Sequence, residues 1–182
     1  MVCGGGLGQE WVEGKLRPRC QACQFVVFEN PAAVSAAVVL DEGGRILLVQ
    51  RALEPARGCW ALPAGYQDSD EEPWRAAERE AYEETGLTVE AVALLDLLHV
   101  PDAVKKNANV AVYLCRWVAG QLIAGDDALA AKFFALDRLP EPMGFENRQR
   151  ILDKLPVHPA YLKWVDQLRR LAPTQANDRG LQ

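Results

Sequence analysis

Residues 63–87 read PAGYQDSDEEPWRAAEREAYEETGL, and this stretch decides the fold of the chain. Its second half is rich in alanine and glutamate, which are good helix formers, and Gly86 stands where a helix would end. The sequence therefore predicts a helix that runs from about Glu72 to Thr85.

Three carboxylates gather on one side of this predicted helix. At about 100° per residue, Glu80, Glu83 and Glu84 fall within an arc of roughly 100°. A different, apolar face is lined by Trp74, Ala77 and Ala81. Glu80 and Glu84 repel each other as an i,i+4 pair, and the macrodipole disfavours anions in the last turn. Because only Arg79 offers local relief, we infer that a cation from outside completes the cluster, and carboxylate oxygens favour Mg²⁺ or Mn²⁺.

The full spacing argues against the alternative, which is a solvated acidic face. From Gly65, five residues lead to Glu71, seven more lead to Arg79, and REAYEETGL follows without a gap. This pattern resembles the Nudix box, the signature of hydrolases that act on nucleoside diphosphates linked to another moiety. The resemblance implies a Nudix fold, a mixed-sheet α/β/α sandwich, for residues 31–172.

The resemblance also implies roles for residues of this pattern. Glu80, Glu83 and Glu84 would bind Mg²⁺ or Mn²⁺. The Gly65 carbonyl oxygen would assist them and Arg79 would orient a glutamate, so that the catalytic set is Arg79, Glu80 and Glu83. Because a diphosphate bridge is anionic, hydrolysis needs both cations on its oxygens and a base that activates water.

The general base is not fixed by the pattern. Family relatives often place another glutamate in a distal loop before an aromatic strand, and the aligned position here is Ala130. Asp126, Asp127 or Glu146 could substitute, or the acids of the box could act alone. Glu71 lies at the start of the predicted helix, where the dipole favours it, and we expect it to stabilise the junction of loop and helix.

Three residues outside the box are candidate substrate contacts. The guanidinium of Arg51 suits a diphosphate, and an ordinary surface arginine is the alternative. Trp60 could stack on a base, although a tryptophan between Cys59 and Ala61 is also typical of core packing. Asp127 is the third candidate.

Runs of apolar and alternating residues on both sides of the helix predict a sheet. Strands are predicted at residues 32–41 and 45–51, which form a hairpin, and at 88–100, 109–118 and 132–136. Further predictions are a polar loop at residues 102–109, amphipathic helices at 145–155 and 159–171, and a loose tail at 173–182.

Residues 1–30 form a separate, ribbon-like segment. Cys20 and Cys23 make a CxxC pair, and Cys3 adds a third thiol. A structural zinc site, in contrast, has four protein ligands. Gly6 stands where a second CxxC would end. The segment resembles the zinc ribbon that precedes the catalytic domain in Nudix pyrophosphatases for NADH, FAD and ADP-ribose. A metal-free, degenerate ribbon and a Zn²⁺ site on Cys3, Cys20 and Cys23 are the two alternatives, and the missing cysteine favours the first.

Composition and charge exclude several classes of protein. A chain of 182 residues that is 49% hydrophobic can bury one good core and carry a small appendage. A net charge of −5 argues against a protein that holds nucleic acid on a broad basic surface. No apolar run approaches the ~20 residues of a membrane span and no signal pattern opens the chain, so we expect no membrane contact and a cytoplasmic location. An odd number of cysteines, five, disfavours a secreted disulfide framework.

These features predict a metal-dependent pyrophosphatase whose partner is a small nucleotide such as FAD, ADP-ribose or NADH. NADH is the least favoured, because the SQPWPFPxS-like stretch of NADH pyrophosphatases is absent. One alternative is a house-cleaning hydrolase of damaged nucleoside triphosphates, which releases inorganic pyrophosphate. Another is a non-catalytic nucleotide sensor, against which the intact acid set argues. Dimers are common in the ADP-ribose type, so a homodimer is a further expectation.

Overall fold

The computed structural model describes residues 3–103 and 106–171 of the chain. Contacts divide the chain into two compact units, Met1–Pro31 and Ala32–Gln182. The predicted tail at residues 173–182 lies outside the described residues. Among the helices of the described part, none is long and apolar enough to cross a membrane.

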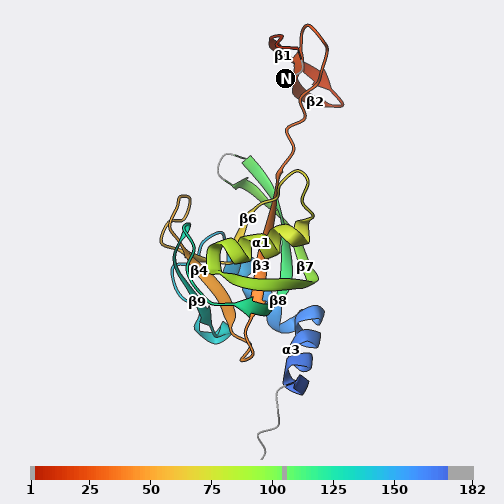
Figure 1. Cartoon of the computed structure of the whole chain (residues 1–182). Coiled ribbons are helices and arrows are strands. Elements are labelled where there is room, and N and C mark those ends of the chain that lie inside the picture. The colour runs from red at the N-terminus through yellow and green to blue at the C-terminus, as the bar shows by residue number, and fades with distance from the viewer. Residues whose placement is uncertain (1–2, 104–105, 172–182) are drawn as a thin grey trace, which may run out of the picture. The chain divides into compact units, whose positions relative to one another are not determined.

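The N-terminal unit is a two-stranded hairpin (Figure 1). Strands β1 (Leu7–Val12) and β2 (Lys15–Cys20) pair antiparallel. Glu13 and Gly14 join them with φ values of 52° and 75°, a left-handed turn that suits the twist of a tight hairpin. Within residues 3–31, the only buried residue that the structure describes is Cys20, which is 4% exposed. This part of the chain therefore lacks an apolar core.

The second unit is built on a mixed sheet centred on β3 (Ala32–Leu40). Along its whole length β3 pairs in parallel with β8 (Lys106–Gly120), and β8 pairs antiparallel with β7 (Leu87–Ala103). The other edge of β3 is shared by two strands. At its carboxyl end it pairs with β4 (Ile46–Arg51), and at its amino end it pairs with β6 (Ala64–Tyr66). Strand β4 also pairs with β5 (Trp60–Ala61) and β9 (Ala128–Phe134).

Residues of β3 alternate between two apolar layers, because successive side chains in a strand point to opposite faces. Ala37 and Val39 pack beneath helix α1 (Pro73–Thr85), which lies across the sheet in Figure 1. Ala36 and Val38 pack on the other side. That side is covered by η2 (Leu152–Val157) and α3 (Pro159–Leu171), which follow the short α2 (Asn147–Arg150). Leu136 of η1 (Leu136–Arg138), which follows β9, packs on the same side. The predicted mixed α/β architecture is confirmed.

Three predictions about single elements differ from the structure. The polar stretch 102–109 is largely strand, because the β7–β8 ladder continues through Val100↔Ala108 to Ala103↔Lys106. The helix expected at residues 145–155 is only the short α2, followed by the 3₁₀ segment η2. Phe145 has a left-handed backbone, and Pro156 has no N–H with which to continue an α-helix. The strand expected at 132–136 begins earlier, at Ala128.

Candidate active site

Helix α1 holds the acidic cluster in a fixed place. The predicted helix is confirmed at Pro73–Thr85, and Gly86 ends it with φ 69° and an N–H that donates to the Tyr82 carbonyl oxygen at 2.7 Å. Only glycine fits there, since a Cβ would lie 2.8 Å from the backbone oxygen of Gln121. The face that packs on the sheet is made of Ala76, Ala77, Ala81 and Thr85. Trp74, which was predicted on this face, is instead half-exposed beneath the Arg75 guanidinium.

Arg79 lies at the centre of the acids. Its Nε and Nη2 each donate to a carboxylate oxygen of Glu71 at 2.9 Å. Its Nη1 donates to Glu80 at 2.7 Å and to Glu83 at 3.1 Å, and Nη2 also reaches the Tyr66 carbonyl oxygen at 2.9 Å. The hydrogen bond from Arg79 lowers the pKa of Glu71. Arg79 therefore ties the loop before the helix to the acids on the helix.

Gly65 brings the backbone of β6 against a carboxylate. It pairs with Ser35 of β3, and a Cβ added to Gly65 would lie 2.2 Å from Oε1 of Glu80. Only glycine leaves room for the Glu80 side chain in this position. Burial raises the pKa of Glu80, although the hydrogen bond from Arg79 opposes this shift.

Glu84 carries a buried oxygen without a partner. Its Oε2 has no hydrogen bond in the part of the chain that the structure describes. Burial and the negative charge of Glu80 raise the pKa of Glu84 to about 8, against the lowering effects of Arg51 and the Ala64 backbone. A buried acceptor without a partner is destabilising. The Glu84 Oε2 is therefore free to bind a ligand from outside the protein.

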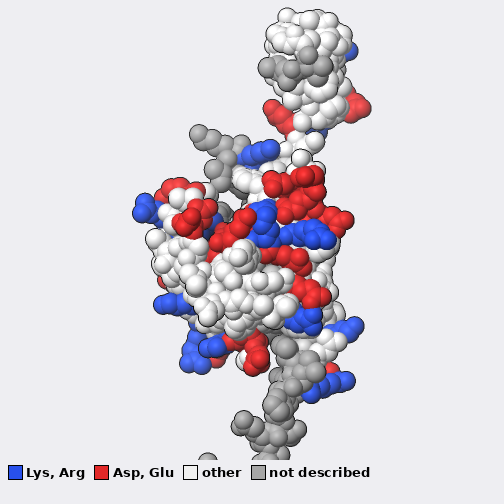
Figure 2. All heavy atoms as spheres, viewed as in Figure 1, with Lys and Arg blue, Asp and Glu red and all other residues white. Residues whose placement is uncertain are grey.

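The donor set fits a hard divalent cation. Carboxylates of Glu80, Glu83 and Glu84 can supply oxygens, and the backbone of Gly65 lies against the Glu80 carboxylate. The Glu83 side chain is 55% exposed, so the cluster is open to solvent on one side. In Figure 2, acidic side chains with basic ones among them gather on the face where α1 lies.

A cavity of about 370 Å³ borders this cluster and shares Ala64 and Gly65 with it. Its floor is apolar and comes from strands β3, β7 and β8, with side chains Val34, Ala36, Leu98, Val100, Ala108 and Val110. Polar and aromatic groups are added by Arg51, Phe145, Asn147 and Arg150. A flat apolar group attached to a phosphate would find complementary surfaces here.

Arg51 lies between the cavity and the acids. Its Nε donates to the Pro55 carbonyl oxygen at 2.9 Å, and its guanidinium lies 4.9 Å from the centroid of the Phe145 ring. Its charge also lowers the pKa of Glu84. This position suits a phosphate contact, and direct binding of substrate by Arg51 stays a prediction.

Trp60 occupies the core and does not contact the cavity. It is 8% exposed, and its ring meets Phe134 edge-on at a centroid distance of 4.8 Å. Trp60 is thus packed in the core, which was the alternative to stacking on a base. A base could stack on Trp60 only if the core opened. Ala130 is also packed against the core. The position that aligns with the distal glutamate of family relatives therefore contributes no carboxylate to the site.

The turn before β9 lies at the carboxyl end of α1. Gly125 N–H donates to the Glu84 carbonyl oxygen at 2.9 Å, which satisfies a terminal helix carbonyl. A Cβ on Gly125 would lie 2.0 Å from the Glu83 backbone oxygen, so only glycine permits this approach. Asp127 follows in an exposed position, and its charge raises the pKa of Glu84. The side chains of Asp127 and Glu84 are therefore close enough to interact electrostatically.

Three cavity residues were not predicted from the sequence. Phe145 faces Arg51, Asn147 Oδ1 accepts from the Leu62 N–H at 2.9 Å, and Arg150 Nη2 donates to the His99 carbonyl oxygen at 2.8 Å. The only signal was an aromatic, two amides and two arginines in FENRQR, within a stretch that the sequence predicts as a plain amphipathic helix.

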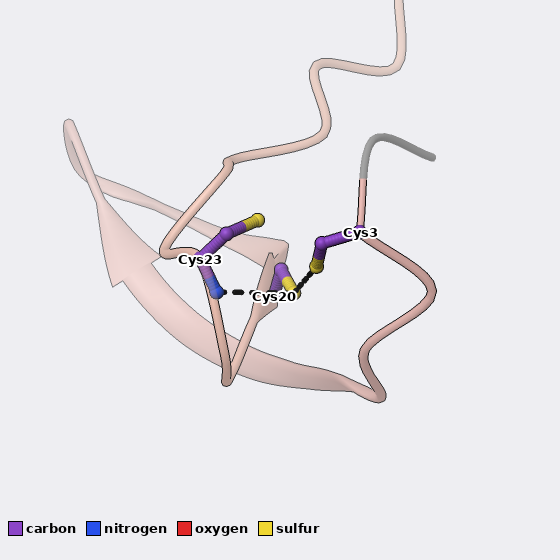
Figure 3. Close-up of side chains that lie close together, drawn as sticks. All are labelled: Cys3, Cys20 and Cys23. Carbon is purple, nitrogen blue, oxygen red and sulfur yellow. Dashed lines mark hydrogen bonds between the residues drawn. The ribbon is translucent and has the colours of Figure 1, made fainter.

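A second cluster of ligating side chains lies in the N-terminal unit (Figure 3). The Sγ atoms of Cys3, Cys20 and Cys23 all lie within 4.8 Å of one another. The backbone N–H groups of Cys23 and Ala22 lower the pKa of the Cys20 thiol to about 7. The three predicted ligands are thus brought together, while binding of zinc stays a prediction.

Comparisons with known proteins agree with this geometry. The family model described as NUDIX domain matches residues 29–155, well over half of the chain. A protein named ADP-ribose pyrophosphatase from Methanocaldococcus jannaschii is 34% identical over 142 residues, which cover 78% of this chain and 79% of that protein. A protein named 8-oxo-dGDP phosphatase from Mus musculus is 34% identical over 121 residues, which cover 63% of this chain and 36% of that protein.

Solved structures share the fold. A NUDIX hydrolase from Nitrosomonas europaea has a TM-score of 0.74 at 24% identity and covers 84% of this chain and 89% of its own. A MutT NUDIX hydrolase from Burkholderia pseudomallei has a TM-score of 0.61 at 35% identity and covers 66% of this chain and 95% of its own. The box acids, the mixed sheet and the matched family model lead to one conclusion: the chain belongs to the NUDIX hydrolase family.

Proposed function

We propose that this protein hydrolyses the pyrophosphate bond of a nucleoside diphosphate linked to another moiety, with ADP-ribose or FAD as the type of substrate. The observation that carries the proposal is the buried, unpartnered Oε2 of Glu84 beside Glu80 and Gly65, at the border of an apolar cavity. Relatives named ADP-ribose pyrophosphatase support this substrate class.

The acids of the box would hold Mg²⁺ or Mn²⁺, with oxygens from Glu80, Glu83, Glu84 and the Gly65 carbonyl. Such a cation supplies charge neutralisation at the phosphate oxygens, so that water can approach the phosphorus. Arg79 is a positioning residue in this proposal. Its donors are engaged by Glu71, Glu80, Glu83 and the Tyr66 carbonyl, so it acts by holding carboxylates in place.

Asp127 is our candidate for the general base. The aligned distal position, Ala130, has no acid and packs on the core, whereas Asp127 is exposed at the carboxyl end of α1 and interacts with Glu84. Asp126 is its matched control, since it is exposed in the same turn. Asp127→Asn should lower kcat by about 10²-fold or more, as loss of a general base does, while Asp126→Asn should leave it unchanged. Wild-type rates in both variants would transfer the role to the acids of the box.

The cavity supports a flat group on the far side of the phosphates. Its floor is apolar, Phe145 offers an aromatic surface, and Arg51 lies where the diphosphate would pass toward Glu84. A nucleobase or a flavin fits this description better than a second phosphate chain does.

A second candidate is clearance of damaged nucleotides, which the relative named 8-oxo-dGDP phosphatase favours. Product analysis with Mg²⁺ and then Mn²⁺ separates the candidates. Diphosphate-linked substrates such as FAD, NADH and ADP-ribose yield two monophosphates, a nucleoside triphosphate yields inorganic pyrophosphate, and 8-oxo-dGDP yields inorganic phosphate. No hydrolysis of any of these would instead support a nucleotide sensor. We further propose membership of the zinc-ribbon subgroup, for which the hairpin with its three cysteines is the support.

A further inference from the structure

The N-terminal unit needs something other than apolar packing to hold its shape. It spans Met1–Pro31, and among its described residues Cys20 alone is buried. Two large side chains of the hairpin, Trp11 and Leu16, are exposed. Units of fewer than ~40 residues usually need disulfides, a metal or a partner chain for stability. The cysteines of this unit are free, so a disulfide does not fill that need.

The three thiols converge from two separate segments. Cys3 precedes β1, whereas Cys20 ends β2 and Cys23 follows it (Figure 3). The Sγ atoms of Cys3 and Cys20 are 3.4 Å apart. Backbone N–H groups point at the sulfurs, from Gly5 to Cys3 at 3.4 Å and from Cys23 to Cys20 at 3.5 Å. Such donors stabilise thiolates, which are the form that binds metal.

Gly5 shows that the backbone is fitted closely around the sulfurs. A Cβ on Gly5 would lie 2.9 Å from the Cys20 Sγ and 3.3 Å from the Cys3 Sγ. A Cβ on Gly6, in contrast, would meet nothing within 4 Å. Gly6 follows Cys3 at the same interval at which Cys23 follows Cys20. The position that would supply a fourth ligand therefore has space but no side chain.

We propose that Cys3, Cys20 and Cys23 form a three-thiolate site for Zn²⁺ or a similar thiophilic ion, whose fourth coordination position is open to solvent. Within the described residues, no histidine or carboxylate joins the group of three. A closed structural zinc site has four protein ligands, whereas a site with three keeps a position for an exchangeable ligand. Water fills that position in our proposal, and a small external thiol can replace it. Binding releases protons from the thiols to solvent and transfers no electrons.

The proposal does not depend on nucleotide hydrolysis, so it can be tested by spectroscopy. The full chain would be freed of metal, kept reduced with a phosphine, and titrated with Co²⁺. We expect one Co²⁺ per chain with a thiolate-to-metal charge-transfer band, displaced by Zn²⁺. The acids of the box cannot give this band, because they carry no sulfur.

Cysteine variants locate the ion. Cys3→Ser, Cys20→Ser and Cys23→Ser should each weaken binding by more than about 100-fold, the upper end of what loss of an outer-shell partner costs. Cys59→Ser is the matched control, because Cys59 lies in the other unit, and it should bind as the wild type does. Absence of the charge-transfer band in the wild type, or its retention in Cys20→Ser, would overturn the proposal.

Gly6→Cys tests the open position by adding a ligand, so it does not depend on whether serine variants fold. It should tighten Co²⁺ binding at least about tenfold and strengthen the charge-transfer band, as a fourth thiolate does. In the wild type, added 2-mercaptoethanol should shift the Co²⁺ spectrum toward that of Gly6→Cys, and in the variant it should have no effect. A wild-type Co²⁺ spectrum that already indicates four sulfur ligands would contradict an open site. A spectrum that does not change when 2-mercaptoethanol is added would contradict it as well.

Discussion

Two clusters of metal-ligating side chains differ in what holds them in place. The carboxylates of Glu80, Glu83 and Glu84 stand on one helix, which packs on a sheet and has Arg79 among its acids. The thiols of Cys3 and Cys20 come from segments seventeen positions apart, in a unit whose described residues form no apolar core. The first cluster is thus preformed by the fold, whereas in our proposal the second is completed by an ion. Removal of metal should therefore stop chemistry at one and loosen structure at the other.

The largest expected effect is on catalysis at the preformed cluster. Glu83→Gln should lower kcat by roughly 10²–10³-fold, as loss of one group that stabilises developing charge does. Because the Glu83 side chain is 55% exposed, the unfolding temperature should hardly change. Steady-state kinetics and calorimetry measure the two quantities.

Glu72→Gln is the control for this change. Glu72 is exposed at the start of the same helix, and its side chain makes no capping hydrogen bond in the described structure. It should hydrolyse substrate at the wild-type rate. A Glu83→Gln protein that is as active as Glu72→Gln would show that the cluster has another task.

The second effect concerns structure at the thiol cluster. Stripping the thiol-bound ion should raise amide exchange in β1 and β2 by about 100-fold or more, because the metal contributes the folding free energy of such a unit. The amides of α1 should keep their protection, since that helix is held by the core of the other unit. Hydrogen exchange with mass spectrometry separates these peptides. Unchanged exchange in the hairpin would mean that it is stable without an ion.

The third effect tests how closely the preformed cluster is fitted. Gly65→Ala places a Cβ 2.2 Å from Oε1 of Glu80, so the carboxylate or the strand has to move. We expect kcat/KM to fall about tenfold to 100-fold, the scale of a 1 Å misplacement in an active site. Gly43→Ala is the control, because its Cβ would meet Asp41 only at an ordinary contact distance of 3.4 Å. Equal kinetics of the two variants would show that the contact with Gly65 is not required.

The helix and its acids could be predicted from the sequence because their signals are local. Helix formers, the terminal Gly86 and the box spacing all lie within one stretch of residues, and the structure bears out the helix. The cavity could not be predicted in this way. Phe145, Asn147 and Arg150 reach it through the left-handed backbone at Phe145 and contacts to Arg51, Leu62 and His99, which are distant in sequence.

Errors in the strand and loop predictions have a similar cause. Polarity suggested a loop at residues 102–109, but strand pairing across β7 and β8 extends through Lys106 and Asn109, which are exposed. Trp60 was ambiguous because a tryptophan near a pocket and a tryptophan in a core have the same local sequence. Its contact with Phe134 of β9 decides between them, and that contact depends on tertiary packing.

The fourth expected effect is the pH dependence of stability that the preformed cluster imposes. Burial and Glu80 raise the pKa of Glu84 from 4.5 to about 8 in the folded protein, so the folded state holds a proton that the unfolded state has released. The contribution of this group is fully present below pH 4.5 and is lost as the pH rises through about 8. In metal-free protein, the free energy of unfolding should fall over this range by up to about 1.4 kcal/mol per pH unit. Urea unfolding at several pH values in the presence of a chelator measures this slope.

Glu84→Gln should remove most of that slope, because a glutamine has no proton to exchange, and Glu80, whose pKa is also raised by burial, should leave a smaller remainder. Mg²⁺ should reduce the slope in the wild type, since a cation that binds the ionised carboxylates stabilises the folded state more as protons leave. Cys20→Ser is the control for the thiol cluster. If this variant keeps the pH dependence of the unfolding free energy, the thiols are not its source. If the slope is the same in Glu84→Gln and in the wild type, the fold does not hold repelling carboxylates together at this cluster. The two clusters would then differ only in how well the surrounding residues pack.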